Sequence, residues 1–395
     1  MKNDVTLVIL MPPGDDKKGS SGSDLYGLSL IDRNLHAAER SGMARVVIIG
    51  TPGTVLHVAE VGIPVEMVEA GTLCLNSIAG TVIVMAGHAL ADTKWLSGII
   101  AASAVSGGCM VEPDVIAALA CDADGDWRDR PVAPGGPDAF FTILDQSKCR
   151  SFPPDREGRF IMESSRDVVA AENWLLQRLI KSGDSFMART INRPLSLAIT
   201  RRLARTDVTP NQITIISVLI GLMGALFFLS MDPMIQTTGA FILLIHNVVD
   251  GCDGELARLK FQSSRMGLIL DMWGDNLVHA VLFACMGIGW SFHSGMTWPL
   301  VVAGIAVVGT LWTAWLVFRR TMRSAEPGRV PQFLSVAENV DTKLSRILRN
   351  LGNRDFFFGI FALSLFGKGQ WLLPLVAMGS VLYAIGLIVL NRREQ

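Results

Sequence analysis

Four aspartates stand close together in an apolar part of the sequence, at spacings that suit helices. Asp250 and Asp253 are three residues apart, and Asp271 and Asp275 are four apart. On a helix, each spacing places both side chains on one face, and the short connection between the pairs lets the two acidic faces meet. Carboxylates at membrane depth are costly and usually face a polar cavity. This constellation therefore needs positive charge beside it.

Bound metal would supply that charge. Carboxylate oxygens suit hard divalent cations such as Mg²⁺ or Mn²⁺, and two such ions would balance the four aspartates. Two ions would also clamp a pyrophosphate and stabilise the attacking and leaving oxygens of an in-line displacement at phosphorus. The alternative is an ion-pair network of the aspartates with Arg258, Lys260 and Arg265.

Other residues near the acids fit the same chemistry. Three small residues are Gly254, Ala257 and Gly267. Small residues let helices approach closely and let a nucleotide lie against the backbone, and Arg258 could pair with a phosphate. His279, one turn beyond Asp275, is either a polar side chain facing the helix bundle or a further metal ligand.

The complete pattern, D-x2-D-G-x2-A-R-x8-G-x3-D-x3-D, resembles the signature of the CDP-alcohol phosphotransferase family, and all eight fixed positions are met. The likeness extends over roughly Asn192–Leu390. It implies an enzyme that transfers a phosphoalcohol group from a CDP-alcohol to a hydroxyl acceptor and releases CMP, in phospholipid or polar head-group synthesis. An inositol phosphate-type product is one such case. It also implies a homodimer.

The resemblance assigns roles to individual residues. It implies that Asp250, Asp253, Asp271 and Asp275 hold two Mg²⁺ or Mn²⁺ ions, with Asp275 also the general base. It implies that the CDP site is lined by Gly254, Ala257, Arg258 and Gly267. Asn211 and Thr214 join this set, because Thr209–Thr214 resembles the family's entry into its first span.

Composition and hydropathy predict two domains and a linking helix. Half of the 395 residues are hydrophobic, 18% are charged, and the net charge of −1 gives no sign of a nucleic-acid partner. Residues 1–183 alternate short apolar strands with helices, which predicts a Rossmann-like α/β domain with a mostly parallel sheet. The expected strands are Val5–Met11, Arg45–Gly50, Val65–Glu69, Thr81–Gly87, Ala139–Leu144 and Arg159–Glu163. The expected helices are Leu25–Ser41, Asp92–Ala102 and Arg166–Ile180. The six cysteines show no metal-ligand spacing and are expected to be free thiols.

Residues 210–395 predict an α-helical membrane domain of six spans. The spans are Ile213–Met231, Thr237–Leu259, Gly267–Phe292, Trp298–Phe318, Asp355–Phe366 and Trp371–Leu390. Arginine and lysine are concentrated in the second and fourth connections between spans. The positive-inside rule therefore predicts that both termini lie in the cytoplasm. The expected location is the inner or plasma membrane of the cell. Between the domains, residues 184–209 read as a basic amphipathic helix on the membrane surface from Pro194 onward, or as a solvated linker helix.

The N-terminal domain resembles a nucleotidyltransferase, on Leu25–Gly50 and Val82–Leu96. Two features depart from that family's pattern. The loop after the first strand carries Asp15 and Asp16, which would oppose a triphosphate, and His88 stands where a metal-binding aspartate is expected. A degenerate, structural or regulatory domain and an active one both remain open, because Lys17 and Lys18 suit phosphate binding. For the whole chain, a membrane transporter with acids along an ion path and a non-catalytic membrane scaffold are the alternatives.

Overall fold

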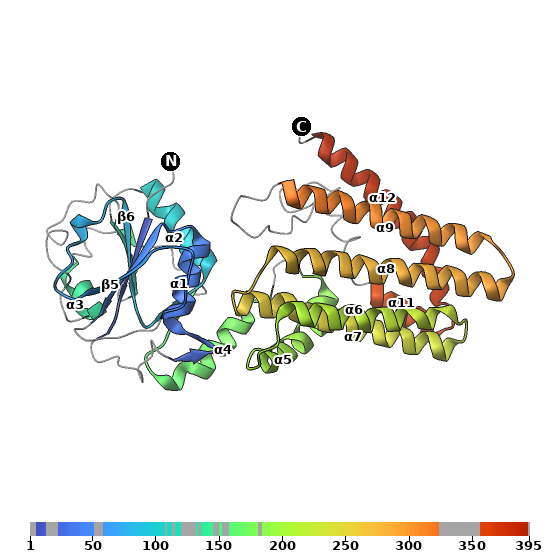
Figure 1. The fold of residues 1–395 in the computed structure, drawn as a ribbon, viewed down its shortest axis with the longest axis horizontal. Helices are drawn as coiled ribbons and strands as arrows, with labels where there is room; N and C mark the ends of the chain where they lie inside the picture. The colour runs from blue at the N-terminus through green and yellow to red at the C-terminus, as the bar shows by residue number, and fades with distance from the viewer. Residues whose placement is uncertain are drawn as a thin grey trace. The chain divides into compact units, whose positions relative to one another are not determined.

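The protein is described by a computed structural model over residues 5–12, 23–50, 58–106, 109–112, 115–119, 132, 136–144, 150–151, 158–180, 184–323 and 356–393. The chain divides into two compact units, Met1–Gln177 and Arg178–Gln395 (Figure 1). Residues 13–22, the loop after the first strand that carries Asp15, Asp16, Lys17 and Lys18, and residues 324–355, most of the basic connection, lie outside the described residues.

The first unit is built on one sheet with the order β10-β8-β9-β6-β1-β4-β5. Its strands are β1 (Val5–Leu10), β4 (Arg45–Gly50), β5 (Val65–Glu69), β6 (Thr81–Ala86), β8 (Cys109–Glu112), β9 (Ile116–Leu119) and β10 (Arg150–Ser151). β1 pairs in parallel with β4 and β6, and β4 with β5, whereas β9 is antiparallel to β6 and β8. The mostly parallel α/β sheet expected from the sequence is present.

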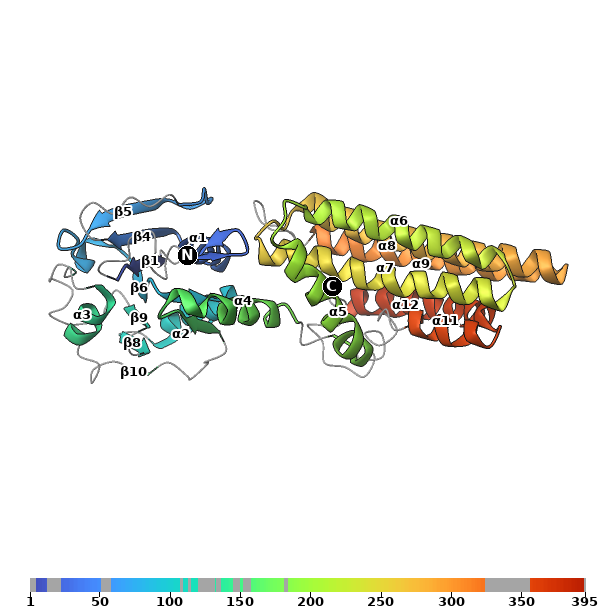
Figure 2. The ribbon, with the colours of Figure 1, turned by 90° about the horizontal axis from the view of Figure 1, so that it is seen from below.

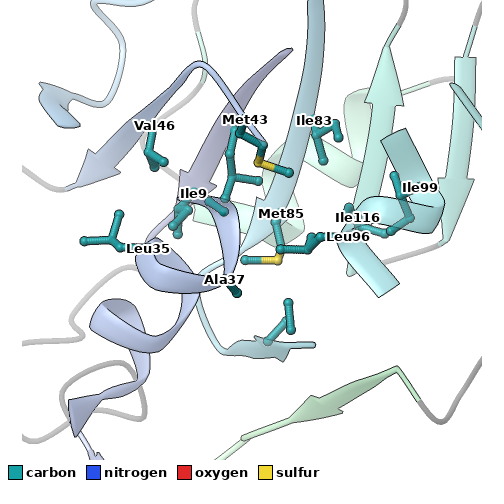
Figure 3. Packing of buried hydrophobic residues seen from close by; sticks show 14 of the residues in the cluster. Ile9, Leu35, Ala37, Met43, Val46, Ile83, Met85, Leu96, Ile99 and Ile116 are labelled. Carbon is teal, nitrogen blue, oxygen red and sulfur yellow. The ribbon is translucent and has the colours of Figure 1, made fainter. Parts of the chain in front are cut away.

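Helices cover both faces of this sheet because its strands are apolar on both sides. They are α1 (Leu30–Ser41), α2 (Thr93–Ser106) and α3 (Gly136–Ile143), whereas α4 (Val168–Gln177) packs in a separate cluster with Leu25, Leu30 and Leu90. On one face, Ile9 and Ile83 pack with Leu35 of α1 and Leu96 of α2 (Figure 3). On the other face, alternate strand residues pack with Phe140 and Phe141 of α3. Such two-sided burial is typical of a parallel sheet.

Three expectations for this unit were wrong. Of Ala139–Leu144, expected as a strand, all but Leu144 lie in α3, because a short apolar run does not by itself distinguish a strand from a buried helix. The helix expected from Leu25 begins at Leu30, after a hairpin of β2 (Asp24–Leu25) and β3 (Leu28–Ser29) that turns at Tyr26 and Gly27 with positive φ. Free thiols were expected throughout, but Cys109 is disulfide-bonded, whereas Cys74, Cys252 and Cys285 are free. A separate two-stranded antiparallel sheet pairs β7 (Ala89–Ala91) with β11 (Arg159–Ile161).

The second unit is helical. Its elements are α5 (Arg193–Leu203), α6 (Pro210–Leu226), α7 (Pro233–Leu259), α8 (Arg265–Ser294), α9 (Trp298–Arg323), α11 (Phe356–Leu365) and α12 (Leu372–Arg393). Helices α6, α7 and α8 run side by side along the bundle, and α5 is shorter and packs on α7 (Figures 1 and 2).

Local capping residues set where these helices begin. The Thr209 hydroxyl accepts a hydrogen bond from the Gln212 backbone N–H, and the Gln212 side-chain oxygen accepts one from the Thr209 backbone N–H. Pro210 lies in the first turn of α6. Asp232 caps α7 and Ser264 caps α8. Because these caps fix the helix starts, they also fix which faces of α7 and α8 carry the aspartates.

Four helical segments of the described chain are long and apolar enough to cross a membrane: Pro210–Leu229, Arg265–Ser294, Trp298–Arg323 and Gly369–Gly386. Helix α7 has 27 residues and is long enough, but it carries the acids of the motif. Helix α11 has only 10 residues. By length and composition, therefore, four of the six expected spans are found.

Glycines allow the closest helix contacts in the bundle. A Cβ on Gly239 of α7 would lie 2.8 Å from the carbonyl oxygen of Gly224 in α6. A Cβ on Gly289 of α8 would lie 2.5 Å from the carbonyl oxygen of Phe228. In contrast, a Cβ on Gly304 of α9 would meet nothing within 4 Å. The first two positions therefore hold α6, α7 and α8 in register.

We predict that Gly289→Ala lowers the Tm of the detergent-solubilised protein by several degrees, because the methyl group would press on backbone that cannot give way. Overpacking of this kind costs about 1–3 kcal/mol. Thermal unfolding followed by tryptophan fluorescence measures it, with Gly304→Ala as the matched control. Equal Tm values for the two variants would contradict the packing described here.

Candidate metal and nucleotide site

Three of the four aspartates converge between α7 and α8. One carboxylate oxygen from each of Asp250, Asp271 and Asp275 lies within 4.8 Å of the other two. Asp250 and Asp275 are buried, at 3% and 8% exposure, and Asp271 is half-buried. Like charges held this close in a poorly solvated place repel strongly, so the arrangement favours a bound cation.

The fourth aspartate is held differently. Asp253 is buried one turn further along α7, and it lies outside the group of three. Its Oδ2 accepts a hydrogen bond from the Thr214 hydroxyl of α6, and its Oδ1 accepts from the Gly254 N–H. Thr214 was expected in the nucleotide site, and the structure places it against a carboxylate of the motif.

The remaining residues of the motif lie at the same end of α7 and α8. A Cβ on Gly267 would lie 2.9 Å from Oδ1 of Asn211, so these two predicted site residues are neighbours. A Cβ on Gly254 would lie 3.2 Å from Nη1 of Arg258. Arg258 thus folds back over Gly254, and its Nε is buried with no hydrogen-bond partner in the described chain. Ala257 accepts the Gln262 N–H through its carbonyl, in the turn that ends α7.

Two polar side chains beside the carboxylates, Ser217 and His246, were not predicted from the sequence. The Ser217 hydroxyl lies 3.4 Å from Oδ1 of Asp250. His246 is 1% exposed, its Nδ1 lies 2.8 Å from the Ser217 carbonyl oxygen, and its Nε2 lies 4.0 Å from Oδ1 of Asp275. Helical spacing was the available signal: Ser217 follows Thr214 by three residues and His246 precedes Asp250 by four.

Glu255, inside the motif but not one of its fixed positions, was also missed. It is fully buried and accepts hydrogen bonds from Ser196 at 2.7 Å, Thr200 at 2.8 Å and Nη1 of Arg193 at 2.7 Å, all from α5. Arg193 also donates to Asp184. Burial alone would lower the pKa of Arg193, but its hydrogen bonds to Asp184 and Glu255 outweigh burial and raise the pKa. The guanidinium therefore stays charged.

Two alternatives from the sequence can be compared with the geometry. Within the described residues, no ion pair joins Arg258, Lys260 or Arg265 to the four aspartates, and Lys260 instead donates to the Thr206 carbonyl at 2.7 Å. Among the described residues, these three basic side chains therefore do not form the alternative network with the aspartates. The His279 ring packs against Phe283, Phe356 and Phe357, and it is not among the clustered ligand atoms.

Residues 207–340, which include all of these aspartates, match the family model described as CDP-alcohol phosphatidyltransferase. This part of the chain is therefore similar to a CDP-alcohol phosphatidyltransferase domain. The match contains α6, α7 and α8, and so contains the motif, the caps of these helices and the glycine contacts between them.

Named proteins resemble the chain over part of its length. The bifunctional IPC transferase and DIPP synthase of Aquifex aeolicus is 31% identical over 38% of this chain and 36% of its own length. The protein of that name from Thermococcus kodakarensis is 28% identical over 44% and 38%. The phosphatidylinositol phosphate synthase of Mycobacterium tuberculosis is 26% identical over 49% of this chain and 85% of its own length. The chain thus spans less than half of the bifunctional relatives.

A crystal structure of the Mycobacterium tuberculosis phosphatidylinositol phosphate synthase with CDP-DAG bound covers 50% of this chain and 92% of its own. Its sequence identity to this chain is 22%, and the TM-score is 0.35.

The two histidines of the bundle should respond differently to substitution. We predict that His279→Phe leaves Tm and divalent-ion binding unchanged, because a phenyl ring suits a pocket of phenylalanines. His246→Phe should lower Tm, because the Ser217 carbonyl loses its contact with Nδ1. Leaving a buried polar group unsatisfied costs about 1–3 kcal/mol. Thermal melts and Mn²⁺ titration followed by electron paramagnetic resonance measure both effects, and loss of Mn²⁺ binding in His279→Phe would make His279 a ligand after all.

Proposed function

We propose that this protein transfers a phosphoalcohol group from a CDP-alcohol to a hydroxyl acceptor and releases CMP, with divalent metal bound at the aspartates. The observation that carries the proposal is the convergence of Asp250, Asp271 and Asp275 inside a helical bundle that is similar to a CDP-alcohol phosphatidyltransferase domain. A transporter would explain buried acids, but it would not explain why the glycine, alanine and arginine positions of the motif are also present.

The chemistry of the donor set fits divalent metal. The clustered ligand atoms are all carboxylate oxygens, which suit Mg²⁺ and Mn²⁺. Asp250, Asp271 and Asp275 would hold one ion, and Asp253 would complete a site for two. Metal bound there would neutralise the charge of a pyrophosphate and of its leaving group.

The chain's own groups supply the proton transfer and the orientation. Asp275 takes the proton from the acceptor hydroxyl, whose oxygen forms a bond to the β-phosphorus of the CDP-alcohol. The bond from that phosphorus to the bridging oxygen breaks, and the oxygen leaves with CMP. Thr214 keeps Asp253 oriented, and positioning of this kind accounts for much of phosphoryl-transfer catalysis.

The nucleotide lies against the small residues of the motif. The nucleotide contacts the backbone at three small residues, Gly254, Ala257 and Gly267. Asn211 lies beside Gly267. Arg258 binds a phosphate of the nucleotide. A phosphorylated acceptor would bind basic residues at the same end of the bundle. Arg201, Arg202 and Arg205 line a hollow of about 450 Å³ on α5, and the name of the mycobacterial relative supports an inositol phosphate as one such acceptor.

The same proposal includes the membrane arrangement. Helices α7 and α11 join the four apolar segments as further spans, because each packs within the bundle. The basic ends of α5 and α9 support a cytoplasmic location for both termini, with α5 on the membrane surface. Dimerisation is proposed on the family resemblance alone.

The N-terminal unit is proposed to be a nucleotidyltransferase-like domain without its own catalysis. Its α/β sheet supports the likeness, and His88 follows β6 at a place where an active enzyme would carry a metal-binding aspartate.

Asp275→Asn is expected to reduce CMP release by at least about 100-fold, because general-base catalysis contributes roughly that much or more. Purified detergent-solubilised protein would be supplied with Mn²⁺, inositol phosphate and a panel of CDP-alcohols that includes CDP-diacylglycerol. The control is Asp232→Asn, since asparagine caps a helix as well as aspartate does. Normal CMP release by Asp275→Asn would remove the proposed base, and absence of release from the wild-type protein with every donor would oppose the assigned reaction.

The full chain carrying Asp275→Asn is expected to release no pyrophosphate from CTP and inositol phosphate. This variant silences the membrane site, so any pyrophosphate would come from the N-terminal unit. A coupled pyrophosphate assay with the Asp15→Lys/Asp16→Lys variant as comparison measures it. Steady release above the protein-free background would show that the N-terminal unit is active.

A further inference from the structure

Glu255 sits in the middle of the aspartate motif and is fully buried. In a helix, the ordinary partner of a glutamate is a basic residue three or four positions away. Arg258 occupies the position three residues beyond Glu255. An ion pair between these two side chains is therefore the arrangement that α7 alone would favour.

The structure shows a different pairing. Glu255 bonds to Arg193, Ser196 and Thr200 of α5, so both of its oxygens are occupied from outside α7. Arg258 folds back over Gly254, and no ion pair of Arg258 is found in the described part of the chain. The motif thus contains a buried arginine, Arg258, whose side chain forms no ion pair with the nearby Glu255 in the described part of the chain.

Arg193 is fixed in the place that makes this possible. Its Nε and Nη2 donate to the two oxygens of Asp184 at 2.8 and 3.0 Å, and its Nη1 donates to Glu255 at 2.7 Å. A guanidinium presents its donors in a rigid planar fork. Two carboxylates, those of Asp184 and Glu255, therefore set its orientation.

We propose that Arg193 is a positioning residue: it holds Glu255 on α5, so that Arg258 stays available to the diphosphate of a cytidine nucleotide. This inference rests on the proposed function, which places Arg258 in the nucleotide site. It gives Arg193 a role in donor binding without contact between Arg193 and the donor. Loss of Arg193 would release Glu255 to pair with Arg258.

Replacing Glu255 should therefore restore the CDP binding that is lost when Arg193 is replaced. We expect Arg193→Gln to weaken CDP binding by about tenfold or more, since it takes a charge-assisted contact from the nucleotide. Glu255→Gln should bind CDP within about twofold of wild type, and the double variant should recover to a similar level. The measurement is isothermal titration of CDP, with Mn²⁺ present, into the full-length protein in nanodiscs.

A second variant separates this effect from general loosening of α5. Lys260 donates a hydrogen bond to the Thr206 carbonyl. This bond joins the turn that follows α5 to the end of α7 and does not involve Glu255. Lys260→Met should therefore leave CDP binding within about twofold of wild type. A purely structural role for Arg193 predicts the opposite order: Lys260→Met would weaken binding, and the double variant would be no better than Arg193→Gln.

The outcomes separate the two proposals. A wild-type protein that binds no CDP would overturn the assigned reaction and this inference with it. If wild type binds CDP but the double variant stays as weak as Arg193→Gln, only the role of Arg193 fails. If Arg193→Gln does not fold, Glu255→Gln and the double variant decide, and weak CDP binding by either folded variant overturns the inference.

Discussion

A carboxylate buried among helices must be matched by positive charge or by hydrogen-bond donors, because the low dielectric inside a bundle leaves it little solvation. Helix α7 meets this constraint in two ways. Glu255 receives three donors from α5, one of them charged. Asp250 instead faces Asp271 and Asp275 of α8, where like charges gather within 4.8 Å. The first arrangement joins one carboxylate to three donors, whereas the second brings three carboxylates together at one place.

The helix packing follows from where the acids must meet. Side chains at Gly224, Gly239 and Gly289 would separate α6, α7 and α8, so glycine at these positions keeps the two acidic faces together. The cap of α6 at Thr209 fixes the start of the helix that carries Thr214, and Thr214 donates to Asp253. A capping residue at a helix end thus determines the partner of a carboxylate more than one turn away.

Sequence spacing predicted those parts of the site that depend on one helix at a time. The pairing of Asp271 with Asp275, and the helical form of α7 and α8, follow from a local period. The separation of Asp253 from the other three, and the position of His246 beside Asp275, depend on how α6 packs. The Arg193–Glu255 bond joins residues 62 positions apart, and no local pattern predicts it. The short apolar run at 139–144 was misread because its length suits either a strand or a helix.

The positions that the motif leaves unspecified have a structural role of their own. Asp250 faces α8, and Asp253 faces α6. Cys252 lies between these two aspartates in the sequence, and Glu255 follows them. Both contact Ser196 of α5 instead. One stretch of helix therefore carries a charged face for cations and a second face that anchors the preceding helix. Both faces lie on the same few turns of α7, so the contacts of Glu255 with α5 lie within five residues of Asp250, Asp253 and Arg258 in the sequence. The identity of the unspecified residues thus matters to the site although the fixed positions alone define the family.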